Sequence, residues 1–150
     1  MATTARTRRG AAGLLGRRLA LLALFENEFR PGSADAALER LAREREVADE
    51  VRQHAARIVG GVAAHLDELD RRIASVAPLI PVPELGRVER TILRSALYEV
   101  LYSAATPSGE TMRDAVSLAR IYAGDAARRL VNGVLGSVSR SSGGGAANGE

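Results

Sequence analysis

The sequence contains no cysteine, no tryptophan and no lysine among its 150 residues. The absence of cysteine excludes disulfides, thiolate metal sites and cysteine nucleophiles. Aromatic residues make up only 3% of the chain, so a core must be built from leucine, valine, isoleucine and alanine. All 21 basic residues are arginines, so every positively charged side chain can fork onto a phosphate or a carboxylate.

Long apolar runs are also missing. No run approaches the roughly 18 apolar residues that are needed to cross a bilayer, and no signal-peptide core is present. We therefore expect a cytoplasmic protein without a membrane partner. The apolar fraction of 46% is nevertheless sufficient for the core of one domain. Aliphatic residues interspersed with arginine and glutamate favour helices, and no long run alternates with period two, so the predicted fold class is all-α.

The clearest helical pattern runs from Leu85 to Tyr102. Its apolar residues form a main row along one helix face, and Glu89 is a charged residue within that row. The apolar residues of that row recur at spacings of three and four, which places them on one helix face: Leu85, Val88, Ile92, Ala96 and Val100. A second apolar row lies beside the first, so the apolar surface is wider than a solvent-facing helix needs. We predict a central helix that is packed on several sides.

Prolines and glycines divide the rest of the chain into about six further short helices. Ser33 or Asp35 is expected to cap the second helix, and Pro81-Val82-Pro83 is expected to be extended. The predicted helices cover approximately residues 14–30, 33–45, 47–62, 66–77, 110–122 and 126–140. The predicted organisation is a flexible arginine-rich arm, a helical domain and a disordered tail, at residues 1–13, 14–140 and 141–150.

The sequence gives little support for a catalytic site or a metal-binding site. His54 and His65 are read as two surface histidines, because a metal site normally needs three or four protein ligands. Asp67, Glu68 and Asp70 lie on a polar helix face beside arginines, which is typical of ordinary ion pairing. We therefore predict neither an enzyme nor a cofactor.

The beginning of the chain carries positive charge and no acidic residue. A flexible arm of this kind is typical of phosphate binding in an intracellular protein, although a disordered N-terminus or an organelle transit peptide has a similar composition. The arginines of residues 1–18 are Arg6, Arg8, Arg9, Arg17 and Arg18. Arg128 and Arg129 form a second basic spot at the start of the last helix. The shortage of aromatics argues against a base-stacking platform, so RNA binding would rest on arginines and the RNA backbone.

Asn132-Gly133 interrupts an otherwise apolar turn of the last helix. A glycine at such a position costs about 0.5–1 kcal/mol relative to alanine. We expect a packing role for the pair, with Gly133 permitting close helix contact and Asn132 bonding to a neighbouring backbone.

Five segments of the chain resemble, in order and at the right spacing, the motifs of the NusB antitermination factors. The segment ARRLVNGVL resembles the family's C-terminal S-x-K-F-V-N-G-V-L pattern, and VERTILRSALYEVLY resembles its V-E-x-x-V-L-R-x-A-x-Y-E-L helix. RRLALLALFENEF is similar to the opening helix, and HAARIVGGVAAHLDELDRRI to the middle segment. Seven residues fall, without a gap, in the spacing of the family's P-x-x-x-A-I-N-E-A-V-E-L-A segment: Pro107, Met112, Asp114, Ala115, Val116, Leu118 and Ala119. The resemblance covers about residues 14–138.

The resemblance implies an all-α fold of two helical halves and a non-catalytic RNA-binding activity. NusB proteins pair with ribosomal protein NusE, and the pair recognises the boxA element of nascent RNA, which helps RNA polymerase pass terminators, chiefly in ribosomal RNA operons. The family's RNA contacts map onto the arginines of residues 1–18 and onto Arg128, Arg129 and Leu130. The glutamate of the V-E motif, Glu89, maps onto the NusE side. The family includes dimers, so self-association is implied as well.

Three positions depart from the family pattern. Leu130 replaces an aromatic residue and cannot stack on a base, Ala127 replaces a serine, and Arg113 replaces an asparagine. These departures motivate an alternative hypothesis: a helical protein-interaction module that binds NusE or itself and has weakened RNA recognition.

Overall fold

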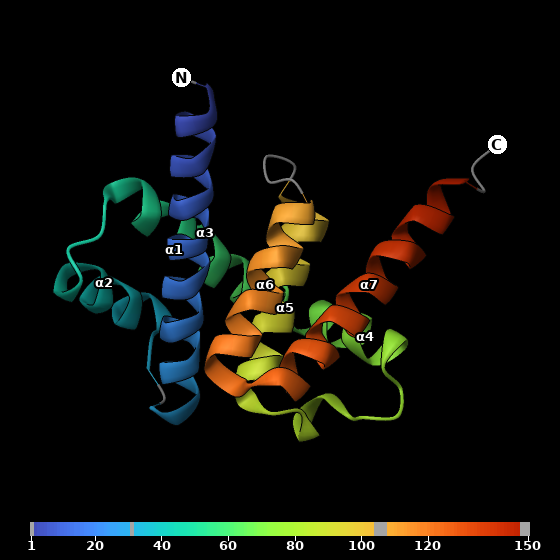
Figure 1. Ribbon diagram of the computed structural model, residues 1–150. Coiled ribbons are helices and arrows are strands. Elements are labelled where there is room, and N and C mark those ends of the chain that lie inside the picture. The colour runs from blue at the N-terminus through green and yellow to red at the C-terminus, as the bar shows by residue number, and fades with distance from the viewer. Residues whose placement is uncertain (1, 31, 104–107, 148–150) are drawn as a thin grey trace.

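The computed structural model describes the backbone of residues 2–30, 32–103 and 108–147, and the side chains of residues 9–30, 32–103 and 109–140. The described residues form seven α-helices and one short 3₁₀ helix (Figure 1). In chain order they are α1 (Ala2–Phe29), α2 (Ala34–Glu44), α3 (Asp49–Ala64), α4 (Leu66–Val76), η1 (Val82–Glu84), α5 (Arg87–Tyr102), α6 (Ser108–Ala123) and α7 (Asp125–Ala147). The predicted all-α fold is confirmed.

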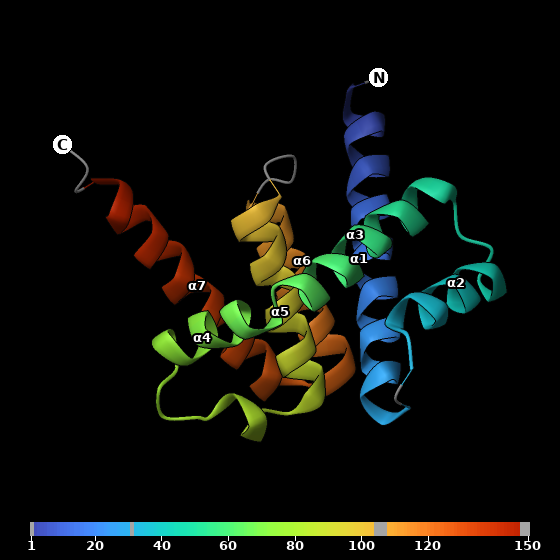
Figure 2. The ribbon, with the colours of Figure 1, turned by 180° about the vertical axis from the view of Figure 1, so that it is seen from behind.

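The helices gather into two packed halves. α1 packs against α2 and α3 in one half, and α6 packs against α5 and α7 in the other. Figures 1 and 2 show the same division from opposite sides, with α1, α2 and α3 at one end and α4 and α7 at the other. α1 also contacts α5 and α6, and α3 contacts α5, so these four helices join the halves.

The predicted central helix is confirmed as α5, which packs against α1, α3, α4, α6 and α7. It begins at Arg87 rather than Leu85, because η1 forms a turn where the proline pattern predicts an extended connector. Leu85 follows that turn in an extended conformation and is still buried. On the inward face Glu99 is buried, whereas Val100, which the pattern places inward, is half-buried. The central helix therefore carries a charge into the core.

Both ends of the helical domain extend further than the sequence pattern predicts. The pattern predicts a first helix from about Leu14 and a last helix to about Arg140, whereas α1 begins at Ala2 and α7 ends at Ala147. In α1 the added residues are rich in alanine and arginine, which are strong helix formers, and adding residues to an existing helix is much easier than nucleating one. The residues added to α7 include three glycines, so helix propensity does not explain that extension. The internal boundaries agree more closely. Ser33 caps α2 as predicted, since its hydroxyl accepts a hydrogen bond from the Ala36 backbone N–H at 3.3 Å.

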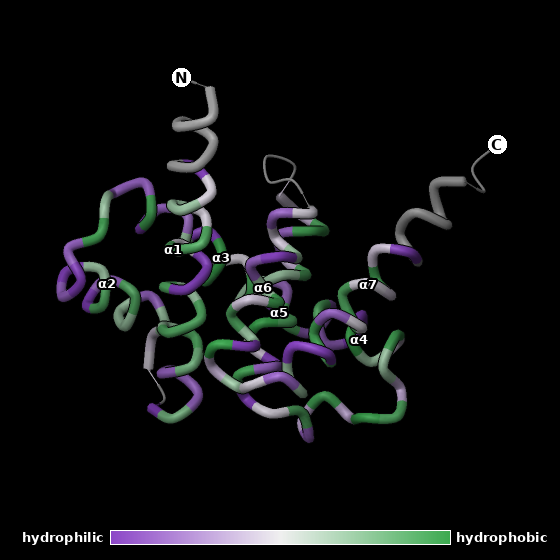
Figure 3. Tube along the Cα trace, viewed as in Figure 1, coloured by the Kyte–Doolittle hydropathy of each residue, from purple (hydrophilic) through white to green (hydrophobic). Residues whose placement is uncertain are grey.

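Apolar residues of each helix face the interior. Figure 3 shows hydrophilic and hydrophobic residues alternating along the helices, as expected where one face of each helix meets a core. The charged residues of α5 that flank this core are paired: Arg90 bonds Glu28 at 2.9 Å, and Arg94 bonds Asp70 at 2.7 Å. Within the described ranges, no helix has the length and apolar character that crossing a membrane requires.

Gly60 and Gly61 of α3 lie in opposite environments, which gives a matched test of the packing. A Cβ atom on Gly61 would lie 2.1 Å from Cζ of Tyr98, whereas a Cβ on Gly60 would meet no atom within 4 Å. We expect Gly61→Ala to lower the free energy of unfolding by about 1–3 kcal/mol, because the Tyr98 ring must move. Gly60→Ala should instead raise it by about 0.5–1 kcal/mol, through helix propensity alone. Urea denaturation followed by circular dichroism measures both, and equal effects would contradict this packing of α3 on α5.

Candidate nucleic-acid interface

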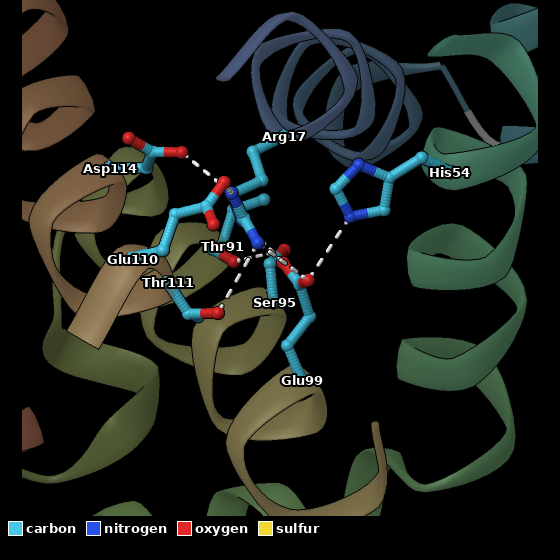
Figure 4. Close-up of polar contacts among 8 residues, drawn as sticks. All are labelled: Arg17, His54, Thr91, Ser95, Glu99, Glu110, Thr111 and Asp114. Carbon is cyan, nitrogen blue, oxygen red and sulfur yellow. Dashed lines mark hydrogen bonds and ion pairs between the residues drawn. The ribbon is translucent and has the colours of Figure 1, made fainter. Parts of the chain in front are cut away.

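A buried charged cluster joins the two halves of the molecule around Arg17 of α1 (Figure 4). Arg17 Nε donates to Glu99 Oε1 of α5 at 2.9 Å, and Nη2 donates to Glu99 Oε2 at 3.1 Å. Nη1 donates to Asp114 Oδ2 of α6 at 2.6 Å and more weakly to Glu110 Oε1 at 3.4 Å. Nη2 also donates to Thr111 Oγ1 at 3.3 Å. One guanidinium therefore links α1 to α5 and α6.

His54 of α3 completes the cluster. Its Nε2 lies 3.1 Å from Glu99 Oε2, and its side chain is only 17% exposed, so the reading of His54 as a surface histidine is wrong. Two glycines of α1 make room for these groups. A Cβ on Gly16 would lie 2.5 Å from His54 Nδ1, and one on Gly13 would lie 2.7 Å from Glu110 Oε1. The two glycines of α1 therefore leave room for the side chains of His54 from α3 and Glu110 from α6.

The carboxylates of this cluster do not titrate alike. Burial raises the pKa of the Glu99 carboxyl, but hydrogen bonds from His54 and Arg17 outweigh burial and hold that pKa below its usual value. At Asp114, burial is the larger influence, and the pKa of this carboxyl is raised despite its bond to Arg17. Burial lowers the pKa of the Arg17 guanidinium, yet its bonds to Glu99 and Asp114 raise it overall. Glu99 is therefore the carboxylate that the cluster holds most firmly in its charged form.

Arg17 is a correction to the predicted RNA-binding set. Its side chain is 6% exposed and surrounded by carboxylates and Thr111, so its guanidinium is not presented to solvent. The physical reason is helical phase: position 17 lies, with Leu21, on the face of α1 that is buried against the rest of the molecule. We therefore exclude Arg17 from the candidate surface.

Arg9 and Arg18 remain exposed on α1. Arg18 Nε donates to the Tyr122 hydroxyl at 2.7 Å, and its guanidinium carbon lies 5.7 Å from the centre of that ring. This contact joins the exposed face of α1 to the last turn of α6, immediately before α7. The side chains of Arg6 and Arg8 lie outside the described residues.

The first turns of α7 carry the second predicted group. Arg129 is 70% exposed and Arg128 is 36% exposed, and both pair with Asp125, at 3.4 and 2.8 Å. Leu130 is half-buried and packs against the core. Arg128 and Arg129 of α7 thus come only a few residues after Tyr122, the α6 residue that Arg18 contacts.

Asn132 and Gly133 do not have the packing role that the sequence predicts. Both residues are exposed, and a Cβ on Gly133 would meet no atom within 4 Å. The close helix contact inferred for this pair is therefore absent at Gly133, and the mid-helix glycine is not explained by packing.

Glu89 lies in the first turn of α5 and is half-buried. Its carboxylate lies against Gly86, the residue that precedes α5: a Cβ atom on Gly86 would be only 1.8 Å from Glu89 Oε2. Nearby in the same turn, the Arg87 guanidinium carbon lies 4.3 Å from the centre of the Phe29 ring, and Phe29 is 54% exposed. An exposed aromatic ring covered by arginine is common at protein interfaces.

Sequence reasoning missed Glu99 and Tyr122. Glu99 lies three residues after Ala96 and seven after Ile92, so helical phase alone places it in the inward row. Nothing local marks Tyr122, because its contact with Arg18 spans 104 positions of sequence.

The sequence is similar to known proteins over most of its length. The sequence model described as the NusB family matches residues 15–140. The transcription antitermination protein NusB of Dehalococcoides mccartyi is 32% identical over 124 residues, which are 83% of this chain and 87% of that protein. The protein of the same description from Herpetosiphon aurantiacus is 38% identical, covering 81% of this chain and 86% of the relative.

Solved structures are similar over most of the chain as well. A crystal structure of antitermination factors NusB and NusE in complex with dsRNA gives a TM-score of 0.79 at 25% identity, covering 89% of this chain and 98% of the matched one. NusB of T. maritima gives a TM-score of 0.80 at 26% identity, covering 85% of this chain and 90% of that one.

Proposed function

The chain belongs to the NusB family of transcription antitermination proteins, and we propose that it binds boxA-type RNA together with ribosomal protein NusE. In this proposal it acts in the cytoplasm within the RNA polymerase antitermination complex and supports transcription of ribosomal RNA operons. The observation that carries the proposal is an exposed set of arginines on α1 and α7, on either side of the contact between Arg18 and Tyr122.

The RNA side of the proposal rests on exposed guanidinium groups. Arg9, Arg18, Arg128 and Arg129 each reach the surface, and arginine forks match phosphate oxygens in geometry. Arg6 and Arg8 belong to the proposed surface through their place in the arginine-rich arm of residues 1–13. If the four exposed arginines each neutralise one phosphate of a single strand, the logarithmic salt slope of binding is about −2.8.

Leu130 determines what kind of RNA binding is proposed. A half-buried aliphatic side chain offers no ring on which a base can stack. Sequence-independent contacts to phosphates therefore contribute most of the affinity of this chain alone, and a partner adds base contacts.

The partner side of the proposal lies at the start of α5. Glu89 provides a half-buried carboxylate in the first turn of α5, and Arg87 of the same turn covers the exposed Phe29 ring. A solved structure of NusB and NusE in complex with dsRNA supports NusE as a partner of this chain, and the motif position of Glu89 is the basis for assigning NusE to this surface.

Fluorescence anisotropy tests the proposal with labelled RNA that contains boxA, titrated with the chain, with NusE and with both. We expect weak, strongly salt-dependent binding by the chain alone and tighter binding by the pair. A scrambled RNA of the same length is the control, and the pair should prefer boxA over it by at least about tenfold.

Equal binding of boxA and scrambled RNA by the pair would contradict the proposal. Binding to NusE that RNA does not affect would favour the alternative, a protein-interaction module with weakened RNA recognition. Light scattering on the same samples measures self-association, which the family resemblance also implies.

A further inference from the structure

A groove is lined by residues of both α6 and α7. The charged residues that line it are Arg113 and Arg120 of α6 and Asp125 and Arg128 of α7. Three arginines and one aspartate thus line it, so the groove is positively charged. The helix segment from residue 109 to residue 120 is roughly 16 Å long, the span of a few nucleotides.

Two of these arginines are not neutralised by internal partners. Both side chains are exposed, and within the described ranges the guanidinium of neither Arg113 nor Arg120 forms a hydrogen bond or an ion pair, although Arg113 interacts with Asp114 through charge. The carboxylate next to Arg113, Asp114, is engaged by Arg17 at 2.6 Å. Most other arginines that flank the core are paired, as Arg90 and Arg94 are. The groove therefore presents guanidinium groups that an anionic ligand can reach without breaking an internal bond.

Asn132 and Gly133 give this groove further features that suit a ligand. Asn132 lines the groove and is exposed, so its amide offers both donors and an acceptor. Gly133, beside it, is exposed without any packing reason for lacking a side chain. Met112 and Val116 supply a half-buried apolar floor between the arginines.

We propose that the groove between α6 and α7 binds a single-stranded segment of RNA that adjoins the element held by α1 and the start of α7. The proposal rests on the proposed function, since it adds a second contact on the same transcript. Continuity favours RNA over an acidic peptide, because Arg128 lines the groove and Arg129, one residue further, lies on the proposed RNA surface. Arginines bind the phosphates, and the apolar floor receives a ribose or a base.

The test compares two boxA RNAs, one minimal and one extended on either side by about six uridines. The variant is Arg113→Gln with Arg120→Gln, and the control is Arg43→Gln with Arg45→Gln, which removes the same charge from exposed positions at the end of α2. α2 lies at the opposite end of the molecule from α7 (Figure 1). NusE is present throughout, and all four substituted residues are exposed, so each variant should fold.

We expect the extension to tighten binding of the wild type and of the control by a factor on the order of ten at about 0.1 M salt. The groove variant should lose this gain, and its salt slope on the extended RNA should be smaller by about 1.4. Its affinity for the minimal RNA should match that of the wild type. In the cysteine-free chain, a nitroxide on Ser117→Cys should lose mobility with the extended RNA only.

Two results would overturn the groove proposal: no gain from the extension, or a gain that the groove variant keeps. Binding of a glutamate-rich peptide that is lost in the groove variant, with RNA binding unchanged, would overturn it in favour of an acidic protein partner. If the wild type with NusE does not bind the minimal boxA RNA more tightly than a scrambled RNA of the same length, the proposed function fails instead. The groove is then still tested by a plain oligouridine, which must bind the wild type more tightly than the groove variant.

Discussion

Replacing Arg17 with methionine is expected to lower the free energy of unfolding by about 3–5 kcal/mol. The substitution removes a guanidinium that is 6% exposed and leaves Glu99, which is 3% exposed, without its main cationic partner. It also removes the bonds to Asp114 and Thr111 that tie α1 to α6. A buried carboxylate without its partner is costly because nothing in the core replaces its hydration. Urea denaturation followed by circular dichroism at neutral pH measures the effect.

The neighbouring residue supplies the control. Arg18→Met removes the same charge from an exposed position and breaks one hydrogen bond to Tyr122, so it should cost about 1 kcal/mol or less. Arg17→Lys keeps the charge but loses the fork, and its cost should lie between the two. If Arg17→Met destabilised the protein no more than Arg18→Met, the buried cluster would not be what holds α1 against α5 and α6.

Glu99→Gln should cost about 3 kcal/mol at neutral pH, and this cost should depend on pH. The pKa of the Glu99 carboxyl is lower in the folded protein than its ordinary value, so its charged form stabilises the fold. That stability is fully present above about pH 4.5 and is lost as the pH falls through the lower, folded-state pKa. The difference in unfolding free energy between wild type and variant should therefore shrink in acid.

The control for this prediction is Glu84→Gln, at an exposed position of η1. Asp114 contributes with the opposite sign, because its pKa is raised: its stabilising effect is present at acid pH and is lost as the pH rises through its folded-state pKa. Asp114 is present in both proteins but shares Arg17 with Glu99, so comparing wild type with Glu99→Gln measures the Glu99 contribution together with its coupling to Asp114. A difference that stayed constant down to the lowest pH measured would contradict a charged Glu99 in the core.

Local sequence patterns predict the helices well, but they do not predict the buried cluster of charged residues between the helices. α5 was predictable because its apolar rows are wide, and Ser33 was predictable as a cap because its hydroxyl acts within its own turn. Arg17 and Arg18 are adjacent and chemically identical, yet one is buried and the other exposed. Only the phase of α1 separates them, since Gly13, Arg17 and Leu21 form one inward row.

The candidate site shows the same division. The motifs predicted the family because five short segments in order are specific, and the matched family range of 15–140 agrees with them. They did not predict the α6–α7 groove, because its lining depends on how two helices lie against each other. The sequence likewise predicts a packing role for Asn132 and Gly133, although both are exposed. Whether a helix position is exposed depends on how the helices pack, and the local sequence does not contain that information.

The most direct measurement is the affinity of boxA-containing RNA for the chain saturated with NusE, in the wild type and in the double variant Arg18→Gln with Arg129→Gln. If the exposed arginines of α1 and α7 hold the transcript, the variant should bind at least about tenfold more weakly at about 0.1 M salt, and its salt slope should be smaller by about 1.4. The double substitution at Arg43 and Arg45 should change neither quantity. An unchanged affinity and slope in the Arg18 and Arg129 variant would contradict RNA binding by this face.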